Sequence, residues 1–394
     1  LDALTNPKFA AIRYKDFIGT DSGDPDYPAV TEWSNRPLPH HASQKRINAI
    51  DKLGGTAWEY VIELSNRVMI DPWINVPVSA TEDYITQLAT MFKENLNPNL
   101  DIYVESSNEV WNTAPAYQQS QWNKAQAADL GIGEHSNHVR RTVEIAQVFE
   151  EVFGEGSLNN RIRVILCSHA PMLKWWVTPA VNYIESTGVT LGDYVYAISC
   201  QSYFSGGADA GESVDKILAD CRQSITKQMD ELGGNQSGRK QWIAKAKEWG
   251  LPGGFCFYEG GPDHGGGSTV NIENRIQAER SEEMAEVFKY NYQDGFFGLG
   301  GNLAIQFTLT SAYNRYGCWG LTDDINNPDR NYKFQAAREL IAATKVEERI
   351  ESPHSFQLFP LYPNPFNPTT TVRFELKTAS NARLFVFNAA GQLV

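Results

Sequence analysis

Short apolar runs alternate with longer amphipathic stretches through most of the chain. The apolar runs are nearly continuous rather than alternating, which is typical of strands that are buried on both faces. These runs lie at residues 9–17, 67–76, 101–109, 161–169, 193–203, 254–261 and 303–311. Between them, apolar residues recur at spacings of three and four, the period of a helix with one buried face. Such stretches lie at residues 82–96, 136–153, 212–232 and 269–293. Strands that alternate with helices predict a parallel sheet covered on both sides.

The number of strand–helix units favours a closed barrel. Seven units precede a last predicted helix at residues 331–346. This number predicts an α/β fold of the (β/α)8 barrel class in which one strand is not visible. An open doubly wound sheet is the alternative, but no GxGxxG motif opens a strand-to-helix turn here.

The pattern changes near residue 350. Residues 353–394 are rich in Pro and Asn and then alternate apolar and polar positions, as in TVRFEL and ARLFVFN. Alternation with period two between turn residues predicts antiparallel strands. We therefore expect two domains: an α/β domain over residues 1–348 and a small β-sandwich over 352–394. Both ends of the chain read as truncated.

Composition narrows the classes of ligand. A formal net charge of −13 argues against nucleic acid or an anionic membrane surface as the main partner. No apolar run approaches the roughly 20 residues that cross a bilayer. The five cysteines are widely spaced without a CxxC pair, so we expect buried thiols rather than a zinc site. These features indicate neutral ligands and no cofactor.

Two carboxylates stand out at the ends of predicted strands, which form one mouth in a barrel. Glu109 lies in SSNEVW and Glu259 in FYEGG. Hydrolysis of a glycosidic bond needs one protonated carboxyl group for the leaving oxygen and one carboxylate that attacks the anomeric carbon or activates water. Such groups lie roughly 5–5.5 Å apart in retaining enzymes and about 6.5–9.5 Å apart in inverting ones. Glu105 has the same strand parity as Glu109 but lies deeper, so we expect it to pair with Arg13.

The strand order carries a resemblance to a known family. If strand one lies upstream and residues 9–17 are strand two, an Asn-Glu pair ends strand four and a Glu ends strand seven. This arrangement resembles the clan A glycoside hydrolases, which are retaining (β/α)8 enzymes. The stretches RVMIDPWINVP, DIYVESSNEVWN and FYEGG are similar to cellulase-like bacterial members. The resemblance covers residues 8–346. It implies that Glu109 is the general acid/base and Glu259 the nucleophile.

The resemblance also implies substrate-binding roles. Asn108 would bind the sugar 2-hydroxyl, Arg13 would keep the nucleophile ionised, and Tyr203 would donate a hydrogen bond to it. Trp319 would form the platform under the sugar, although it lies further from its strand than is usual in the clan.

Further candidates lie near the same strand ends. Three residues lie at positions where the clan has subsite ligands: Trp73, Asn75 and His169. Their residue types match no single pattern of the clan. Trp111 either stacks on a sugar or caps the barrel. In GGPDHGGG (260–267) an Asp and a His could suggest a metal, but we interpret this stretch as a flexible loop.

The C-terminal segment resembles a second family. The motif YPNPFNP is followed by strands with alternating apolar and polar residues and then by Gly-Gln before an apolar residue. This order is similar to the C-terminal sorting domains of the type IX secretion system. This resemblance implies contact with that secretion machinery and a secreted or cell-surface location; an ordinary β-module is the alternative.

Together these features predict a secreted retaining β-glycosidase that acts on a plant or algal β-glucan or a related polysaccharide. One alternative is a non-catalytic glycan-binding barrel, in which the two glutamates do not face each other or ion pairs occupy the mouth. A hydrolase of esters or amides is a second alternative, but no GxSxG motif supports it.

Overall fold

The structure is a computed structural model of the 394-residue chain. It describes residues 1–15, 17–19, 31–44, 55–115, 117–207, 209–230 and 232–344, and in the C-terminal part residues 357–358, 372 and 374–375. The chain divides into two compact units, Leu1–Ile341 and Ala342–Val394.

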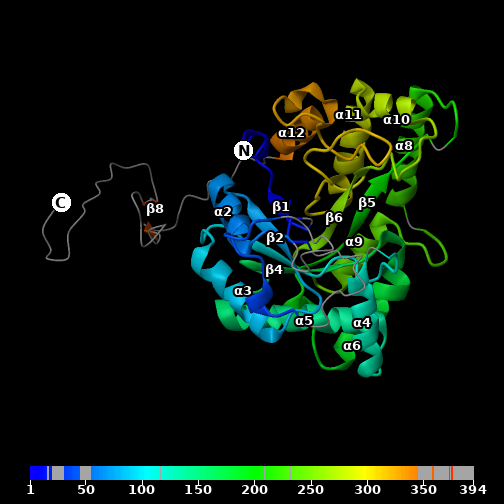
Figure 1. Ribbon diagram of the computed structural model, residues 1–394. Helices are drawn as coiled ribbons and strands as arrows, with labels where there is room; N and C mark the ends of the chain where they lie inside the picture. The colour runs from blue at the N-terminus through cyan, green and yellow to red at the C-terminus, as the bar shows by residue number, and fades with distance from the viewer. Residues whose placement is uncertain are drawn as a thin grey trace, which may run out of the picture. The chain divides into compact units, whose positions relative to one another are not determined.

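Six parallel strands form the sheet of the first unit (Figure 1). They are β1 (Ala11–Arg13), β2 (Asp71–Val76), β3 (Ile102–Ser106), β4 (Ile162–Cys167), β5 (Ala197–Phe204) and β6 (Gly254–Pro262). Each strand pairs with the next one along the chain, in the order β1-β2-β3-β4-β5-β6. A doubly wound sheet reverses its strand order at a switch point, whereas this order runs in one direction. The predicted barrel class is therefore confirmed.

A seventh segment extends the sheet beside β6. Residues 302–307 run parallel to β6, with hydrogen bonds of 2.9 Å from the Asn302 N–H to the Phe255 carbonyl and from the Ile305 N–H to the Phe257 carbonyl. At its end, the Phe307 ring centre lies 5.8 Å from Nζ of Lys15, just beyond β1. The first and last segments thus approach each other and the barrel is nearly closed. The strand predicted at 303–311 is shorter and less regular than expected.

Helices follow the strands and pack around the sheet (Figure 1). The main ones are α2 (Trp58–Val68), α3 (Glu82–Asn95), α4 (Gln118–Asp129), α5 (Glu134–Phe153), α6 (Thr178–Ser186), α8 (Val214–Met229), α9 (Arg239–Glu248), α10 (Ile272–Glu279), α11 (Glu282–Lys289) and α12 (Tyr332–Thr344). The single helix predicted at 269–293 is wrong: it is divided into α10 and α11. The break occurs at Ser281, whose hydroxyl accepts a hydrogen bond from the Met284 N–H at 3.3 Å and caps α11.

The interior of the first unit is packed with aromatic and branched side chains. Every residue of β3 is buried, and so is all of β2 except its first residue. All five cysteines are buried and free of disulfide bonds, which confirms the prediction of buried thiols. In the parts of the chain that the structure describes, no helix is long and apolar enough to cross a membrane.

The second unit contains one described ladder. Strand β7 (Gln357–Leu358) pairs antiparallel with β8 (Phe374–Glu375). The rest of the sandwich predicted at 352–394 lies outside the described residues.

Candidate active site

The chain turns sharply where β3 ends. Ser107 and Glu109 have φ angles of 60° and 43°, in the left-handed region that non-glycine residues rarely adopt. The turn is held from both sides: Nδ2 of Asn75 donates to the Ser107 carbonyl at 2.7 Å, and Nε2 of Gln119 donates to the Asn108 carbonyl at 2.9 Å. Backbone conformations of this kind cluster at functional sites, where the surrounding structure maintains them. In this turn, these conformations place Asn108 and Glu109 next to each other just after β3.

Arg13, the last residue of β1, connects three groups at the mouth. Its guanidinium donates to both carboxylate oxygens of Glu105 at 2.9 Å, to Oδ1 of Asn108 at 2.8 Å and to Oε2 of Glu259 at 3.2 Å. Glu105 also accepts from Nε1 of Trp73 at 2.8 Å and is 1% exposed. The predicted Arg13–Glu105 pair is therefore confirmed, and Arg13 reaches Glu259 as well. Because one guanidinium serves two carboxylates, this group of three carries a surplus negative charge.

Glu259 lies near the end of β6 and is 8% exposed. Its Oε1 accepts a hydrogen bond from the Tyr203 hydroxyl at 3.2 Å. Burial raises the pKa of Glu259 from 4.5 to about 7; Arg13 opposes the rise and the Glu109 carboxylate adds to it. The Tyr203 hydroxyl stays a neutral donor, because burial and Glu259 raise its pKa well above the usual value. Glu109 and Glu259 therefore lie close enough for the charge of one to act on the protonation of the other.

Glu109 is half-buried, and both of its oxygens accept hydrogen bonds. The Tyr258 hydroxyl donates to Oε1 at 2.9 Å, and Nδ2 of Asn112 donates to Oε2 at 2.8 Å. Tyr258 is fully buried, and the Arg13 guanidinium lies 4.9 Å from its ring centre. Burial, followed by the Glu109 charge, raises the pKa of Tyr258 well above its usual value, so this hydroxyl is a proton-bearing donor at neutral pH.

Tyr258 and Asn112 are site residues that the sequence pattern does not predict. Residues 258 and 259 are adjacent on a strand, so strict alternation would place them on opposite faces. The register between β5 and β6 shifts instead: Cys200 pairs with Phe257 and Gln201 with Glu259, which leaves Tyr258 as the extra residue of a bulge. Bulges next to active sites redirect side chains, and this one lets both residues reach Arg13. For Asn112 the only sequence signal is its position three residues after Glu109.

Four other predicted ligands differ in how deeply they are buried. Trp73 and Asn75 are 0% exposed; Trp73 donates to Glu105 and Asn75 to the Ser107 carbonyl, so both support the mouth from inside the barrel. Trp111 is 7% exposed and packs with its ring centre 6.1 Å from that of Tyr258, which favours the capping alternative. His169 is half-buried; burial lowers its pKa, and the Glu109 charge acts against that change.

Trp319 lies on a separate loop and is half-buried. Its Nε1 donates to Oδ1 of Asp263 at 2.8 Å, and its ring centre lies 5.7 Å from that of Phe307. The Asp263 N–H in turn donates to the carbonyl of Phe204, the residue after Tyr203, at 2.8 Å. Trp319 is thus connected to the mouth through Asp263. Among the described residues, no cluster of three or more His, Cys, Asp or Glu side chains could hold a metal ion.

The fold and the site together define a parallel α/β barrel with two glutamates at one mouth, each held by its own donors. No protein-family model matches the chain, and no curated protein matches it. Similar solved structures include a Paenibacillus polymyxa xyloglucanase from glycoside hydrolase family 44 with xyloglucan. It is 11% identical, with a TM-score of 0.43 over 84% of this chain and 72% of that one. Cel44A, a family 44 endoglucanase from Clostridium thermocellum, is 8% identical, with a TM-score of 0.42 over 75% and 69%.

Proposed function

We propose that this protein is a retaining glycoside hydrolase, with Glu259 as nucleophile and Glu109 as general acid/base. The supporting observation is that the two glutamates at the ends of β3 and β6 have separate sets of donors. Arg13 and Tyr203 donate to Glu259, while Tyr258 and Asn112 donate to Glu109. Two carboxyl groups in different environments are what a double displacement requires.

In the first step, a carboxylate oxygen of Glu259 attacks the anomeric carbon and forms an ester bond to the sugar. The bond from that carbon to the leaving oxygen breaks, and this oxygen takes the proton of Glu109. In the second step, Glu109 removes a proton from water, whose oxygen displaces Glu259 from the sugar and restores both groups. Arg13 and Tyr203 orient Glu259 for attack, and Tyr258 orients Glu109.

The substrate class follows from charge and from the sequence resemblance. A net charge of −13 disfavours polyanionic chains, so we propose a neutral β-linked polysaccharide of the β-glucan type.

The test is release of reducing sugar from a panel of neutral and acidic polysaccharides. Wild type should be active on at least one neutral β-glucan, and Glu259→Ala should lose at least about a thousandfold in kcat. Azide added to Glu259→Ala should restore bond cleavage by occupying the space of the missing carboxylate. Glu82→Gln, an exposed carboxylate change on α3, is the control and should leave the rate unchanged.

Three outcomes would reject the assignment. Activity that survives Glu259→Ala would remove this residue as nucleophile. Proton NMR of the first product that shows an inverted anomer would remove the double displacement. Binding of oligosaccharide without turnover by the wild type would favour the non-catalytic glycan-binding barrel.

For the C-terminal segment 352–394 we infer a role in export through the type IX secretion system, to the medium or the cell surface. The support is the YPNPFNP signature and the alternation that follows it. The full chain, made in a bacterium that has this system, should reach the medium or surface, and a chain that ends at residue 348 should stay inside. Equal export of both chains would reject the inference.

A further inference from the structure

A cluster of ionisable side chains is buried behind the mouth, outside the glutamate pair. His264, Glu279 and Lys333, which we call the buried triad, are each 0% exposed. Nζ of Lys333 donates to Oε2 of Glu279 at 2.6 Å, and Nδ1 of His264 bonds to Oε1 of the same carboxylate. Although burial acts to raise the pKa of Glu279, Lys333 and His264 hold it below the usual value. Burying a charged pair such as Glu279 and Lys333 costs free energy that apolar side chains would avoid. We therefore looked for a function of the triad other than stability.

The triad is not a nucleophilic site, although Cys221 extends it. Sγ of Cys221 lies 3.5 Å from Nε2 of His264, which superficially resembles a Cys-His-Glu arrangement. However, Nε2 also accepts a hydrogen bond from the Gly206 N–H at 3.1 Å, and Cys221 is 0% exposed. Burial raises the pKa of the Cys221 thiol, so the thiolate is disfavoured. No substrate reaches this sulfur.

What the triad contacts is the loop that carries Trp319. Nζ of Lys333 donates to the carbonyl of Cys318, the residue before Trp319, at 2.7 Å. The same Nζ lies 4.5 Å from the ring centre of Tyr313, whose hydroxyl donates to the carbonyl of Gly320, the residue after Trp319, at 2.7 Å. Lys333 is therefore linked to the backbone on both sides of Trp319.

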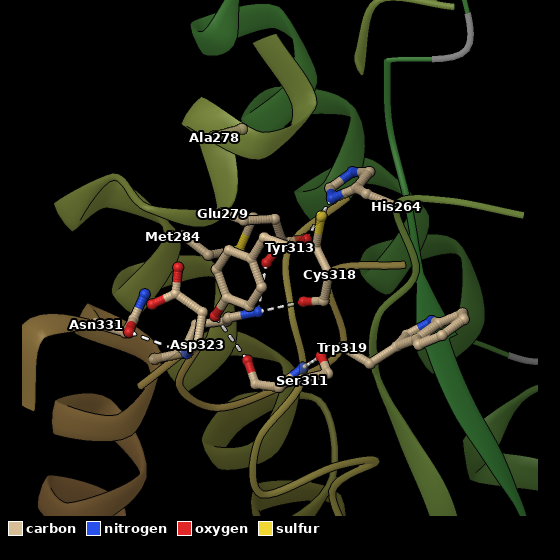
Figure 2. A network of polar contacts seen from close by, with 12 residues as sticks. His264, Ala278, Glu279, Met284, Ser311, Tyr313, Cys318, Trp319, Asp323 and Asn331 are labelled. Carbon is tan, nitrogen blue, oxygen red and sulfur yellow. Dashed lines mark hydrogen bonds and ion pairs between the residues drawn. The ribbon is translucent and has the colours of Figure 1, made fainter. Parts of the chain in front are cut away.

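The triad also holds the partner of the indole. His264 directly follows Asp263, whose carboxylate accepts from Nε1 of Trp319. Figure 2 shows His264 and Cys318 facing each other from two different segments, with the indole of Trp319 directed away from the cluster. Both members of the Asp263–Trp319 pair are thus anchored through an immediate chain neighbour.

Glycines bring the two segments into backbone contact. The N–H groups of Gly266 and Gly267 donate to the carbonyls of residues 316 and 315 at 3.2 and 3.0 Å. A Cβ atom at Gly265 would lie 2.5 Å from Cα of Gly317, and one at Gly317 would lie 2.4 Å from the Trp319 ring. The GGPDHGGG stretch, interpreted from sequence as a flexible loop, is therefore packed against the Trp319 loop and anchored by a fully buried histidine.

We propose that the buried triad is a positioning device that fixes the Asp263–Trp319 pair, and with it the indole face that receives a sugar at the barrel mouth. The use of that face rests on the proposed function. The orientation of the indole does not depend on it, because the contacts that set it lie within the protein.

Two variants test this positioning role, one at the partner of the indole and one in the buried triad. Asp263→Ala removes the acceptor of the indole N–H at an exposed position. The double variant Glu279→Gln with Lys333→Met removes both charges of the pair, so that no buried charge is left alone. Asp101→Asn is the matched control: it removes a carboxylate paired with Arg163 at 2.5 Å, before the start of β3 and so at the opposite end of the strands. Circular dichroism verifies folding. If the double variant does not fold, His264→Gln, which keeps the Glu279–Lys333 pair, decides by the same measurements.

The first measurement needs no catalysis. Acrylamide quenching of Trp319 is obtained as the difference between each protein and the same protein with Trp319→Phe. We expect quenching of Trp319 to rise at least twofold in Asp263→Ala and in the triad variant, and to stay unchanged in Asp101→Asn. Wild-type quenching in the folded triad variant would overturn the proposal.

The second measurement is kinetic. Loss of a stacking platform that binds substrate and transition state alike should raise KM about tenfold with kcat within about twofold. A wild type that degrades no polysaccharide would reject the proposed function alone, and the quenching comparison would still decide on positioning. An unchanged KM together with increased quenching would overturn the role of Trp319 as a platform.

Discussion

The pH dependence of kcat/KM should reveal which role Glu259 performs. As nucleophile it must be ionised, and burial raises its pKa to about 7. The free protein would then hold Glu259 about half ionised at pH 7. Below that pH, kcat/KM should fall tenfold per unit, because only the ionised fraction can attack.

The magnitude follows from the surroundings of this carboxylate. A pKa raised from 4.5 to about 7 corresponds to about 3 kcal/mol in favour of the protonated form. Burial is the largest contribution and Glu109 adds to it. The positive charge of Arg13 opposes both, although this guanidinium is shared with Glu105. Tyr203→Phe removes a donor to the ionised form. This variant should therefore move the acidic limb to higher pH, and lose more activity at pH 6 than at pH 8.

The assay is initial-rate hydrolysis of a soluble substrate at low concentration from pH 4 to 10, for wild type and Tyr203→Phe. Activity after return to pH 7.5 controls for irreversible unfolding. A plateau below pH 7 with a fall above it would refute the reasoning, because that profile is expected if Glu259 is the proton donor. An acidic limb near pH 4.5 would refute the raised pKa.

Three further predictions follow from the same contacts. Tyr258→Phe removes a donor to Glu109 and should lower kcat about tenfold to a hundredfold with little change in KM; an unchanged kcat would contradict its orienting role. Glu105→Gln breaks the hydrogen-bonded pairing of Glu105 with the buried Arg13 guanidinium and should lower the free energy of unfolding by about 3 kcal/mol in urea titrations; a loss below about 1 kcal/mol would show that Glu259 compensates the charge. The folded-state pKa of Glu259 lies above its unfolded value. The contribution of this group to the free energy of unfolding therefore declines as the pH rises from 4.5 to about 7, and it stays at the lower value at higher pH. Glu259→Gln should therefore melt at a higher temperature than wild type at pH 8 and at a similar one at pH 4.5, and the reverse order would contradict the sign.

Several elements could be predicted because their causes are local. Continuous apolar runs with helical stretches between them specify buried parallel strands, since both faces of each strand need covering. The observed bounds of α3 and α5, residues 82–95 and 134–153, lie within two residues of the predicted stretches. Glu109 and Glu259 could be selected for the same reason, because the ends of parallel strands share one mouth in any barrel.

Other features could not be predicted because they arise from pairing between distant segments. Residue order alone places Tyr258 on the opposite face from Glu259, and only the register of β5 against β6 brings both inside. Trp73 bonds to Glu105 of β3, and Asn75 bonds to the turn after it; sequence periodicity describes neither contact.

By itself, the sequence determined the order of strands and helices, the strand ends where polar groups gather, and the two carboxylates worth pairing. These features follow from local periodicity and from the shared direction of parallel strands. Only the tertiary structure decided which donor serves which glutamate, how far burial raises the pKa of Glu259, and that Lys333 donates to the backbone beside Trp319. The physical reason is that hydrogen bonding and desolvation depend on atoms brought together from positions up to 246 residues apart, as for Arg13 and Glu259.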